Sequence, residues 1–197
     1  MDLTADILEE LFSALGAHLE VASLSISIVV VGGASLAAGK LIDRTTKDVD
    51  VIAKAERIDG NLILSKASPV PIEFTSAVER VSRDYGLPKD WLNTVIDSQW
   101  EFGLPPGIEE DITWKTYSTL TVGFVGRKGL IPLKLFASVD QGPRSKHWQD
   151  LINLAPTDVE LSQAATWVKT QDDGAHFKQD VEQASEQLRR ALGRSGN

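Results

Sequence analysis

Hydrophobic and polar residues follow two different periods along this chain. Between positions 4 and 19 apolar residues recur every three or four positions, which predicts an amphipathic helix that packs on a sheet. Residues 25–31 (SISIVVV) are apolar and largely β-branched, as in a buried strand. Residues 46–53 (TKDVDVIA) alternate, with valines on one face and Asp48 and Asp50 on the other, which predicts a second strand.

Small residues lie between these two strands. Gly32 and Gly33 end the first strand, and the alanines and leucines that follow suit a short helix close to it. The local order is therefore strand, glycine turn, helix, strand. Beyond it, the pattern predicts helices at 75–85 and 89–97 and a strand at 118–125.

From position 130 onward the pattern is helical almost throughout. Four segments carry it, at 130–140, 145–155, 159–169 and 180–194, with a polar break at 141–143. The sequence thus predicts an α/β (α+β) fold with a mixed sheet. It divides into an α/β core at residues 1–128 and a helical C-terminal lobe at 129–197 that contributes to the active site.

The amino-acid composition limits the kinds of metal site and the cellular location that we expect. The chain has 197 residues and no cysteine, so any metal ion must be bound by oxygen or imidazole ligands. The three histidines are scattered, which makes a histidine metal site unexpected. No stretch reaches the roughly 20 apolar residues of a membrane span, and the acidic N-terminus is unlike a signal peptide. We therefore expect a cytoplasmic protein without a membrane partner.

The charge is uneven along the chain. The formal net charge of −8 argues against indiscriminate nucleic-acid binding. The segment 127–148 nevertheless holds five lysines and arginines against one aspartate. Either a local anion-binding face or an ordinary solvated surface is compatible with this pattern.

The glycine stretch fits neither of two common phosphate-binding motifs. In a P-loop, four residues separate the glycines, but Gly33 and Gly39 enclose five, and Leu41 stands where the motif needs Ser or Thr. The dinucleotide fingerprint is absent as well, because Gly32 and Gly33 are adjacent. A third interpretation includes the aspartates. Backbone N–H groups at the start of a helix suit a triphosphate, and two carboxylates on one face of a strand suit a hard divalent ion.

This arrangement resembles the signature of the DNA polymerase β-like nucleotidyltransferase superfamily, here Val31-Gly32-Gly33 followed by Asp48-Val49-Asp50-Val51. Within it, the chain looks most like the AbiEii/MenT branch of toxins from bacterial toxin–antitoxin systems. The resemblance implies a polymerase-β-like core in which Asp48 and Asp50 bind Mg²⁺, or Mn²⁺, and activate a hydroxyl. The implied nucleotide-binding residues are Gly32, Gly33, Ser35, Arg44, Lys134, Arg144 and Lys146.

The resemblance also includes a second group of residues, in the helical C-terminal half of the chain. It contains Lys134 within LIPLKLFA, then Arg144, Lys146 and Asp150. An ammonium in an apolar helix is costly unless it meets an anion, so Lys134 either reaches the triphosphate or extends to solvent. Asp150 either takes a proton, orients Lys134, or only begins a helix. The resemblance favours catalytic roles for Lys134 and Asp150.

The sequence departs from the superfamily pattern in two places, one of which is a somewhat long gap between Gly33 and Asp48. The superfamily has a third metal-binding carboxylate on a neighbouring strand, but residues 118–125 contain no acid, and Glu73 is a weak substitute. The departures argue against full two-metal catalysis, and the resemblance to the AbiEii/MenT branch implies one metal ion assisted by Lys134. The five tryptophans are expected to be core or interface anchors, although one of them stacking on a base is an alternative.

The resemblance implies a Mg²⁺-dependent nucleotidyltransferase toxin. It would transfer nucleotides from an NTP to the 3′ end of tRNA, block translation and be neutralised by a cognate antitoxin. Two alternatives stay open: an adenylyltransferase that modifies protein, and an inactive nucleotidyltransferase-like binding module.

Overall fold

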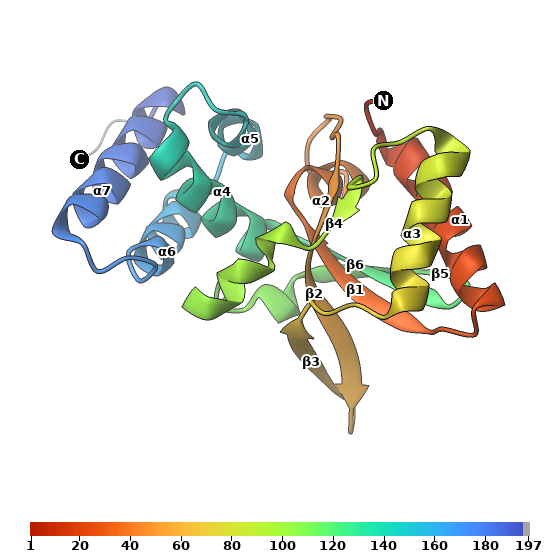
Figure 1. Ribbon diagram of the computed structural model, residues 1–197. Helices are drawn as coiled ribbons and strands as arrows, with labels where there is room; N and C mark the ends of the chain where they lie inside the picture. Colours follow the sequence, from red (N-terminus) through yellow and green to blue (C-terminus); the bar gives the residue numbers. More distant parts are fainter. Residues whose placement is uncertain (195–197) are drawn as a thin grey trace. The chain divides into compact units, whose positions relative to one another are not determined.

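A computed structural model describes residues 1–194, except for the side chains of Asp97 and Ser98. The chain forms two compact units (Figure 1). Unit 1 comprises Met1–Glu101 and Ile112–Gly126, and unit 2 comprises Phe102–Asp111 and the chain from Arg127 onward. The predicted α/β (α+β) class with a mixed sheet is confirmed.

Unit 1 is built on a six-stranded sheet with the order β3-β2-β1-β6-β5, and β4 pairs with β2 as a side branch. Strands β1 and β6 are parallel, as are β2 and β4, whereas the other pairs are antiparallel. The strands are β1 (Ile26–Val31), β2 (Val49–Ile58), β3 (Asn61–Lys66), β4 (Leu92–Asn93), β5 (Ile112–Tyr117) and β6 (Leu120–Val125).

Three helices belong to unit 1: α1 (Ala5–Val21), α2 (Gly32–Ala38) and α3 (Ile72–Tyr85). Helices α1 and α3 lie side by side and share a core with inward-facing residues of β1, β2 and β6 (Figure 1). Thr4 caps α1 by accepting a hydrogen bond from the Ile7 N–H, and α3 ends at Gly86, whose φ of 63° suits glycine.

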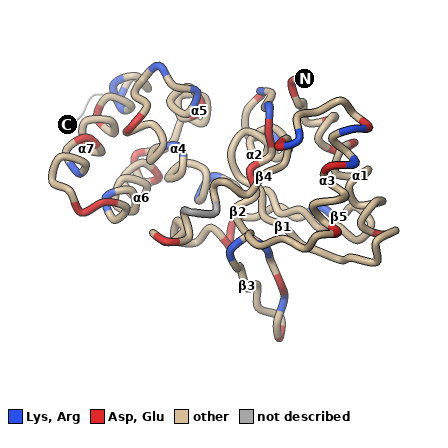
Figure 2. Tube along the Cα trace, in the orientation of Figure 1, with Lys and Arg blue, Asp and Glu red and all other residues tan. Residues whose placement is uncertain are grey.

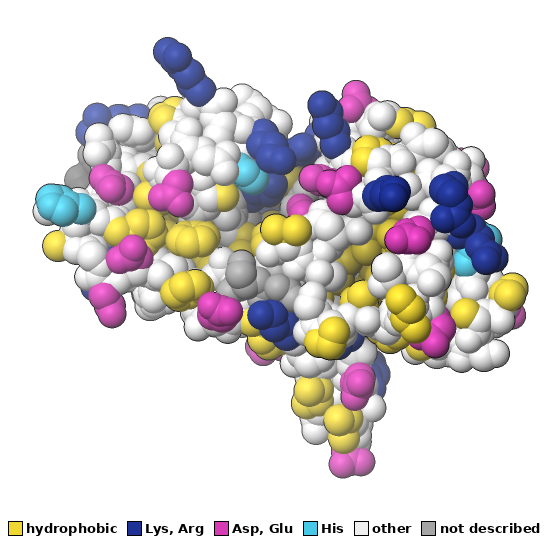
Figure 3. Space-filling model, viewed as in Figure 1, with side chains coloured by type: hydrophobic (Ala, Val, Ile, Leu, Met, Phe, Trp, Pro, Cys, Tyr) yellow, Lys and Arg dark blue, Asp and Glu magenta, His cyan; other side chains and the backbone are white. Residues whose placement is uncertain are grey.

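The β2–β3 hairpin extends from this sheet, and hydrophobic side chains are visible on it in the space-filling view (Figures 1 and 3). Ile58 and Ile63 are among its exposed residues.

One predicted element of unit 1 is wrong. Residues 89–97 were expected to form a helix, but the chain forms β4 at Leu92–Asn93 and then a 3₁₀ helix, η1, at Val95–Phe102. The reason is non-local, because β4 pairs in parallel with the start of β2, more than 40 positions earlier in the chain.

Unit 2 is helical, as the hydrophobic pattern predicts. It contains η2 (Ile108–Glu110), α4 (Arg127–Gln141), α5 (Lys146–Leu154), α6 (Asp158–Val168) and α7 (Ala175–Ala191). Helix α4 contacts each of the other three long helices, and most of its central residues are buried. A reciprocal cap between Thr157 and Glu160 fixes the start of α6. Among residues 1–194, no helix has the length and apolarity that a membrane span requires.

Candidate active site

The register of β1 and β2 places the glycine turn beside the acidic strand. Val31, the last residue of β1, pairs with Asp50, so Gly32 follows directly next to this carboxylate. Gly32 has a φ of 70°, and a Cβ built there would lie 2.6 Å from Asp50 Oδ2. A side chain at this position would displace the carboxylate. The Asp50 carboxylate therefore occupies the space that a side chain at position 32 would need, which requires glycine there.

Gly33 makes a second close approach, to the loop that precedes β2. A Cβ at Gly33 would lie 2.5 Å from Thr46 Oγ1 and 3.3 Å from Arg44 Nη2. The backbone of Thr46 pairs with Leu3, which anchors this loop to the start of the chain. The two glycines thus allow the loop and the acidic strand to approach the turn on different sides.

Asp48 is positioned by the same loop. The Thr46 hydroxyl lies 3.2 Å from Asp48 Oδ1 and 3.1 Å from the Asp48 carbonyl oxygen, and donates toward both. Asp48 and Asp50 are both half-buried, whereas Val49 and Val51 between and beyond them are fully buried in the core. The alternation of the strand therefore turns both carboxylates away from the core, as the period of two predicts. Figure 2 shows acidic and basic positions close together around α2 and β4.

Asn93 belongs to the site although the sequence analysis missed it. Strand β4 pairs Asn93 with Asp50, and its Nδ2 donates to Asp50 Oδ1 at 3.4 Å. The Val95 N–H donates to Asn93 Oδ1 at 3.1 Å, which holds the amide in this orientation. Asp50 therefore accepts a hydrogen bond from the Asn93 amide and lies close to Gly32, where a Cβ would displace it. No signal in the sequence identifies Asn93, because a two-residue strand has no periodicity.

The remaining predicted residues of unit 1 have different environments. The Ser35 side chain is fully buried, and its hydroxyl donates to the Val125 carbonyl at 2.8 Å. To contact a phosphate it would have to give up this bond, so its observed contact joins α2 to β6. Arg44 donates through Nε to the Thr45 carbonyl and lines a hollow of about 370 Å³ together with Lys40 and Asp43.

Glu73 does not complete the acidic group. It is exposed in the first turn of α3 and shares a hollow with His18 and Val21, at the C-terminal end of α1. The loop before β2 is anchored instead next to the N-terminal end of α1, through Leu3. A 17-residue helix is roughly 25 Å long. Glu73 is therefore too far away to substitute for the third carboxylate.

In unit 2, Lys134 of α4 forms a buried ion pair with Asp150 of α5. The distance from Nζ to Oδ2 is 2.7 Å, and the two side chains are only 6% and 4% exposed. This geometry agrees with the alternative in which Asp150 orients Lys134, while the catalytic role of either residue stays a prediction. Arg144 and Lys146 are exposed on the segment that enters α5, where Ser145 caps the helix.

The donor set fits Mg²⁺ only with help from a substrate. Among residues 1–194, no group of three or more histidine or acidic side chains is arranged to hold a metal ion. Mg²⁺ in nucleotide enzymes is commonly bound by one or two carboxylates together with phosphate oxygens and water. Asp48 and Asp50 supply such a pair, so the site suits a Mg²⁺ ion that arrives with a nucleotide rather than a permanent protein cage.

Comparison with known proteins finds a similarity in the same part of the chain that contains the candidate active site. Residues 6–96 match a family model described as a nucleotidyltransferase of unknown function (DUF6036). No curated protein and no solved structure matches the chain. The matched residues include the glycine turn, both aspartates and Asn93, and a similarity of this kind implies an NTP as substrate. The part of the chain that carries the candidate active site is thus similar to nucleotidyltransferases.

Proposed function

We propose that the protein is a Mg²⁺-dependent nucleotidyltransferase that transfers nucleotides from an NTP to the 3′ end of tRNA. The observation that carries the proposal is the close approach of the half-buried Gly32 to the Asp50 carboxylate, because it brings the backbone turn beside a metal-binding acid. The turn would receive the triphosphate, and Asp48 and Asp50 would hold the metal ion that neutralises its charge. The similarity of residues 6–96 to nucleotidyltransferases supports the same reaction class.

The reaction assigns distinct tasks to the residues of the chain. Asp48 and Asp50 hold Mg²⁺, which when bound neutralises phosphate charge and lowers the pKa of the attacking hydroxyl. Asn93 and Gly32 keep the Asp50 carboxylate in one position. The backbone of Gly32 and Gly33 with Arg44 receives the triphosphate.

The chemical step exchanges one phosphorus–oxygen bond for another. The 3′-hydroxyl oxygen bonds to the α-phosphorus, the bond from that phosphorus to the β-phosphate oxygen breaks, and pyrophosphate leaves with the bonding electrons. The hydroxyl proton passes to a carboxylate or to water. In this proposal Lys134, Arg144 and Lys146 add positive charge for the nucleotide, and Asp150 holds Lys134 in place.

The biological role follows from the resemblance to the AbiEii/MenT branch. We propose that the protein is a toxin of a toxin–antitoxin system that acts in the cytoplasm. Nucleotides added to the acceptor end prevent aminoacylation, so translation and growth stop. A cognate antitoxin is the implied protein partner.

The proposal is tested by incubating the purified protein with Mg²⁺, total tRNA and each of the four labelled NTPs. Label in tRNA with the wild type but not with Asp48→Ala or Asp50→Asn is the expected result. Asp59→Asn is a matched control, because Asp59 is an exposed acid at the β2–β3 turn and asparagine tolerates its φ of 52°. Label in protein would support the adenylyltransferase alternative, and no label in either would support the inactive binding module.

A further inference from the structure

Unit 2 contains a pocket that the proposed reaction does not use. It has a volume of about 650 Å³ and is formed by α4, α6 and the segment around 106–110. Every residue that lines it belongs to unit 2, so the pocket is complete within one compact part of the chain. Its volume lies in the range of roughly 300–1,000 Å³ that is typical of small-molecule sites.

The floor of the pocket is apolar and firmly packed. Ile131 and Ala164 are almost completely buried, and Trp167 is 7% exposed. Trp167 packs edge-on against Phe136, with ring centroids 6.3 Å apart, which fixes the indole in place. Pro132 adds a second flat apolar surface. A floor of this kind suits a planar ring better than a flexible chain.

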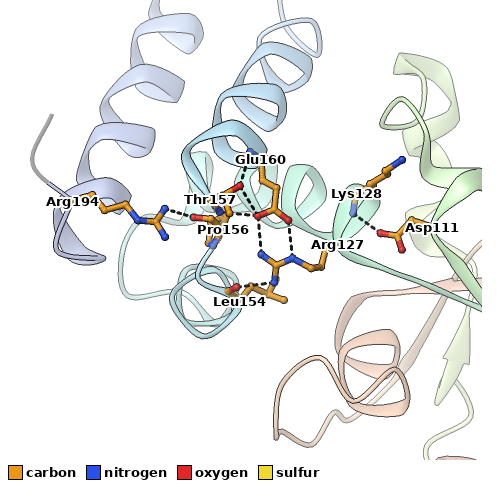
Figure 4. A network of polar contacts seen from close by, with 8 residues as sticks. All are labelled: Asp111, Arg127, Lys128, Leu154, Pro156, Thr157, Glu160 and Arg194. Carbon is orange, nitrogen blue, oxygen red and sulfur yellow. Dashed lines mark hydrogen bonds and ion pairs between the residues drawn. The ribbon is translucent and has the colours of Figure 1, made fainter. Parts of the chain in front are cut away.

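The charged residues of the rim neutralise one another. Arg127 donates through Nε and Nη2 to the two Glu160 oxygens at 2.7 and 2.9 Å, and through Nη1 to the Leu154 carbonyl (Figure 4). These hydrogen bonds hold the pKa of Glu160 at about 2, so the pair is fully ionised at neutral pH. Lys128 is likewise paired with Glu110, at 2.7 Å. The rim therefore offers no excess positive charge that would select a phosphate.

The uncharged polar groups of the rim are mainly acceptors. The Thr166 hydroxyl donates to the Ser162 carbonyl, which leaves its oxygen as an acceptor. The Thr170 hydroxyl donates to the Trp167 carbonyl and already accepts from Gln171 Nε2 at 2.9 Å. Pro132 has no N–H for the carbonyl of Lys128 one turn earlier, so this helix position lacks its usual donor. The exposed Gln163 amide can both donate and accept. A matching ligand should therefore bring N–H and O–H donors along its edge.

We propose that this pocket binds an uncharged purine nucleoside. The base would lie on the floor formed by Pro132 and Trp167, and its N–H groups and the ribose hydroxyls would donate to the rim. The four properties on which this rests are the volume, the flat apolar floor, the neutral rim and its excess of acceptors. The inference does not depend on the proposed transferase reaction, because it involves neither the triphosphate nor the acids of unit 1.

The test is a titration of the full-length protein with adenosine, guanosine, cytidine and uridine, without Mg²⁺, followed by ligand-observed NMR. A purine nucleoside is expected to bind saturably with a dissociation constant on the order of 0.1 mM. Thr166→Trp fills the pocket from an exposed position and should weaken binding at least ~10-fold, and Gln163→Ala should weaken it severalfold. Ser162→Trp is the matched control, since Ser162 is exposed on α6 outside the pocket.

Two results would overturn the inference. One is the absence of saturable binding by either purine nucleoside up to about 10 mM. The other is equal affinity in the wild type and in Thr166→Trp. The variant Asp50→Asn distinguishes this pocket from the proposed active site. Unchanged nucleoside binding in this variant supports the pocket in unit 2. Loss of nucleoside binding would place the nucleoside in unit 1 and refute the inference.

Discussion

Removal of the Lys134 ammonium is expected to destabilise the protein strongly. In Lys134→Met the Asp150 carboxylate, which is only 4% exposed, stays buried but loses the ammonium at 2.7 Å. At an effective dielectric constant near 20 the attraction between two such charges is about 6 kcal/mol. The cost of burying two ions offsets most of this attraction. The pair as a whole therefore contributes little to the free energy of unfolding, whereas the loss of one partner should lower that free energy by about 3–5 kcal/mol.

A double-mutant cycle measures this difference. We expect Lys134→Met alone to lower the free energy of unfolding by about 3–5 kcal/mol and the double variant Lys134→Met/Asp150→Leu to recover most of the loss. The assay is urea unfolding at pH 7. Lys169→Met is the matched control, since Lys169 pairs with Glu182 on the surface, where side chains are 33% and 67% exposed, and should cost less than about 1 kcal/mol.

The cycle also separates structure from catalysis. A cost below about 1 kcal/mol for Lys134→Met would refute the reasoning, because removal of one member of a buried ion pair is expected to lower the free energy of unfolding by several kcal/mol. If the double variant folds but no longer labels tRNA, the Lys134–Asp150 pair acts in the reaction as proposed. If the folded double variant keeps its activity, the pair only joins α4 to α5.

Three further predictions concern single positions. Gly33→Ala places a Cβ 2.5 Å from a threonine hydroxyl and should lower the unfolding free energy by about 1–3 kcal/mol, measured by urea unfolding. Asn93→Ala removes the amide that donates to Asp50, so the affinity for Mn²⁺ in the presence of NTP should fall about 10-fold while the unfolding free energy changes little. Electron paramagnetic resonance measures the Mn²⁺ affinity, and an unchanged affinity would exclude this positioning role. The hydrogen bonds from Arg127 lower the pKa of Glu160 from 4.5 to about 2, so this acid stabilises the fold above pH 4.5 and loses the effect as pH falls toward 2. Glu160→Gln should therefore cost about 1–2 kcal/mol at pH 7, after discounting for solvent screening, and the difference from wild type in unfolding free energy should shrink across that window.

The local pattern of the sequence determined the elements that carry the candidate site. The alternation at 46–53 predicted the strand that carries Asp50, because neighbouring side chains of a strand point to opposite sides, but it placed the start of the strand too early, since β2 begins at Val49 and Asp48 lies in the loop before it. Gly32 and Gly33 marked the turn for a similar reason, since a residue without a Cβ is needed where the backbone approaches another group. The helical period likewise predicted the long helices of the C-terminal half.

Only the tertiary structure decided which groups meet. Asn93 is placed next to Asp50 by the two-residue strand β4, which forms because it pairs with β2. The local sequence at 89–97 had predicted a helix instead. Ser35 stood beside the glycines, yet its hydroxyl is bonded to Val125, 90 positions later. The pairing of Lys134 with Asp150 depended on how α4 packs against α5. Periodicity records which face of an element is buried, but the partner on the other side of the interface is set by packing between distant segments.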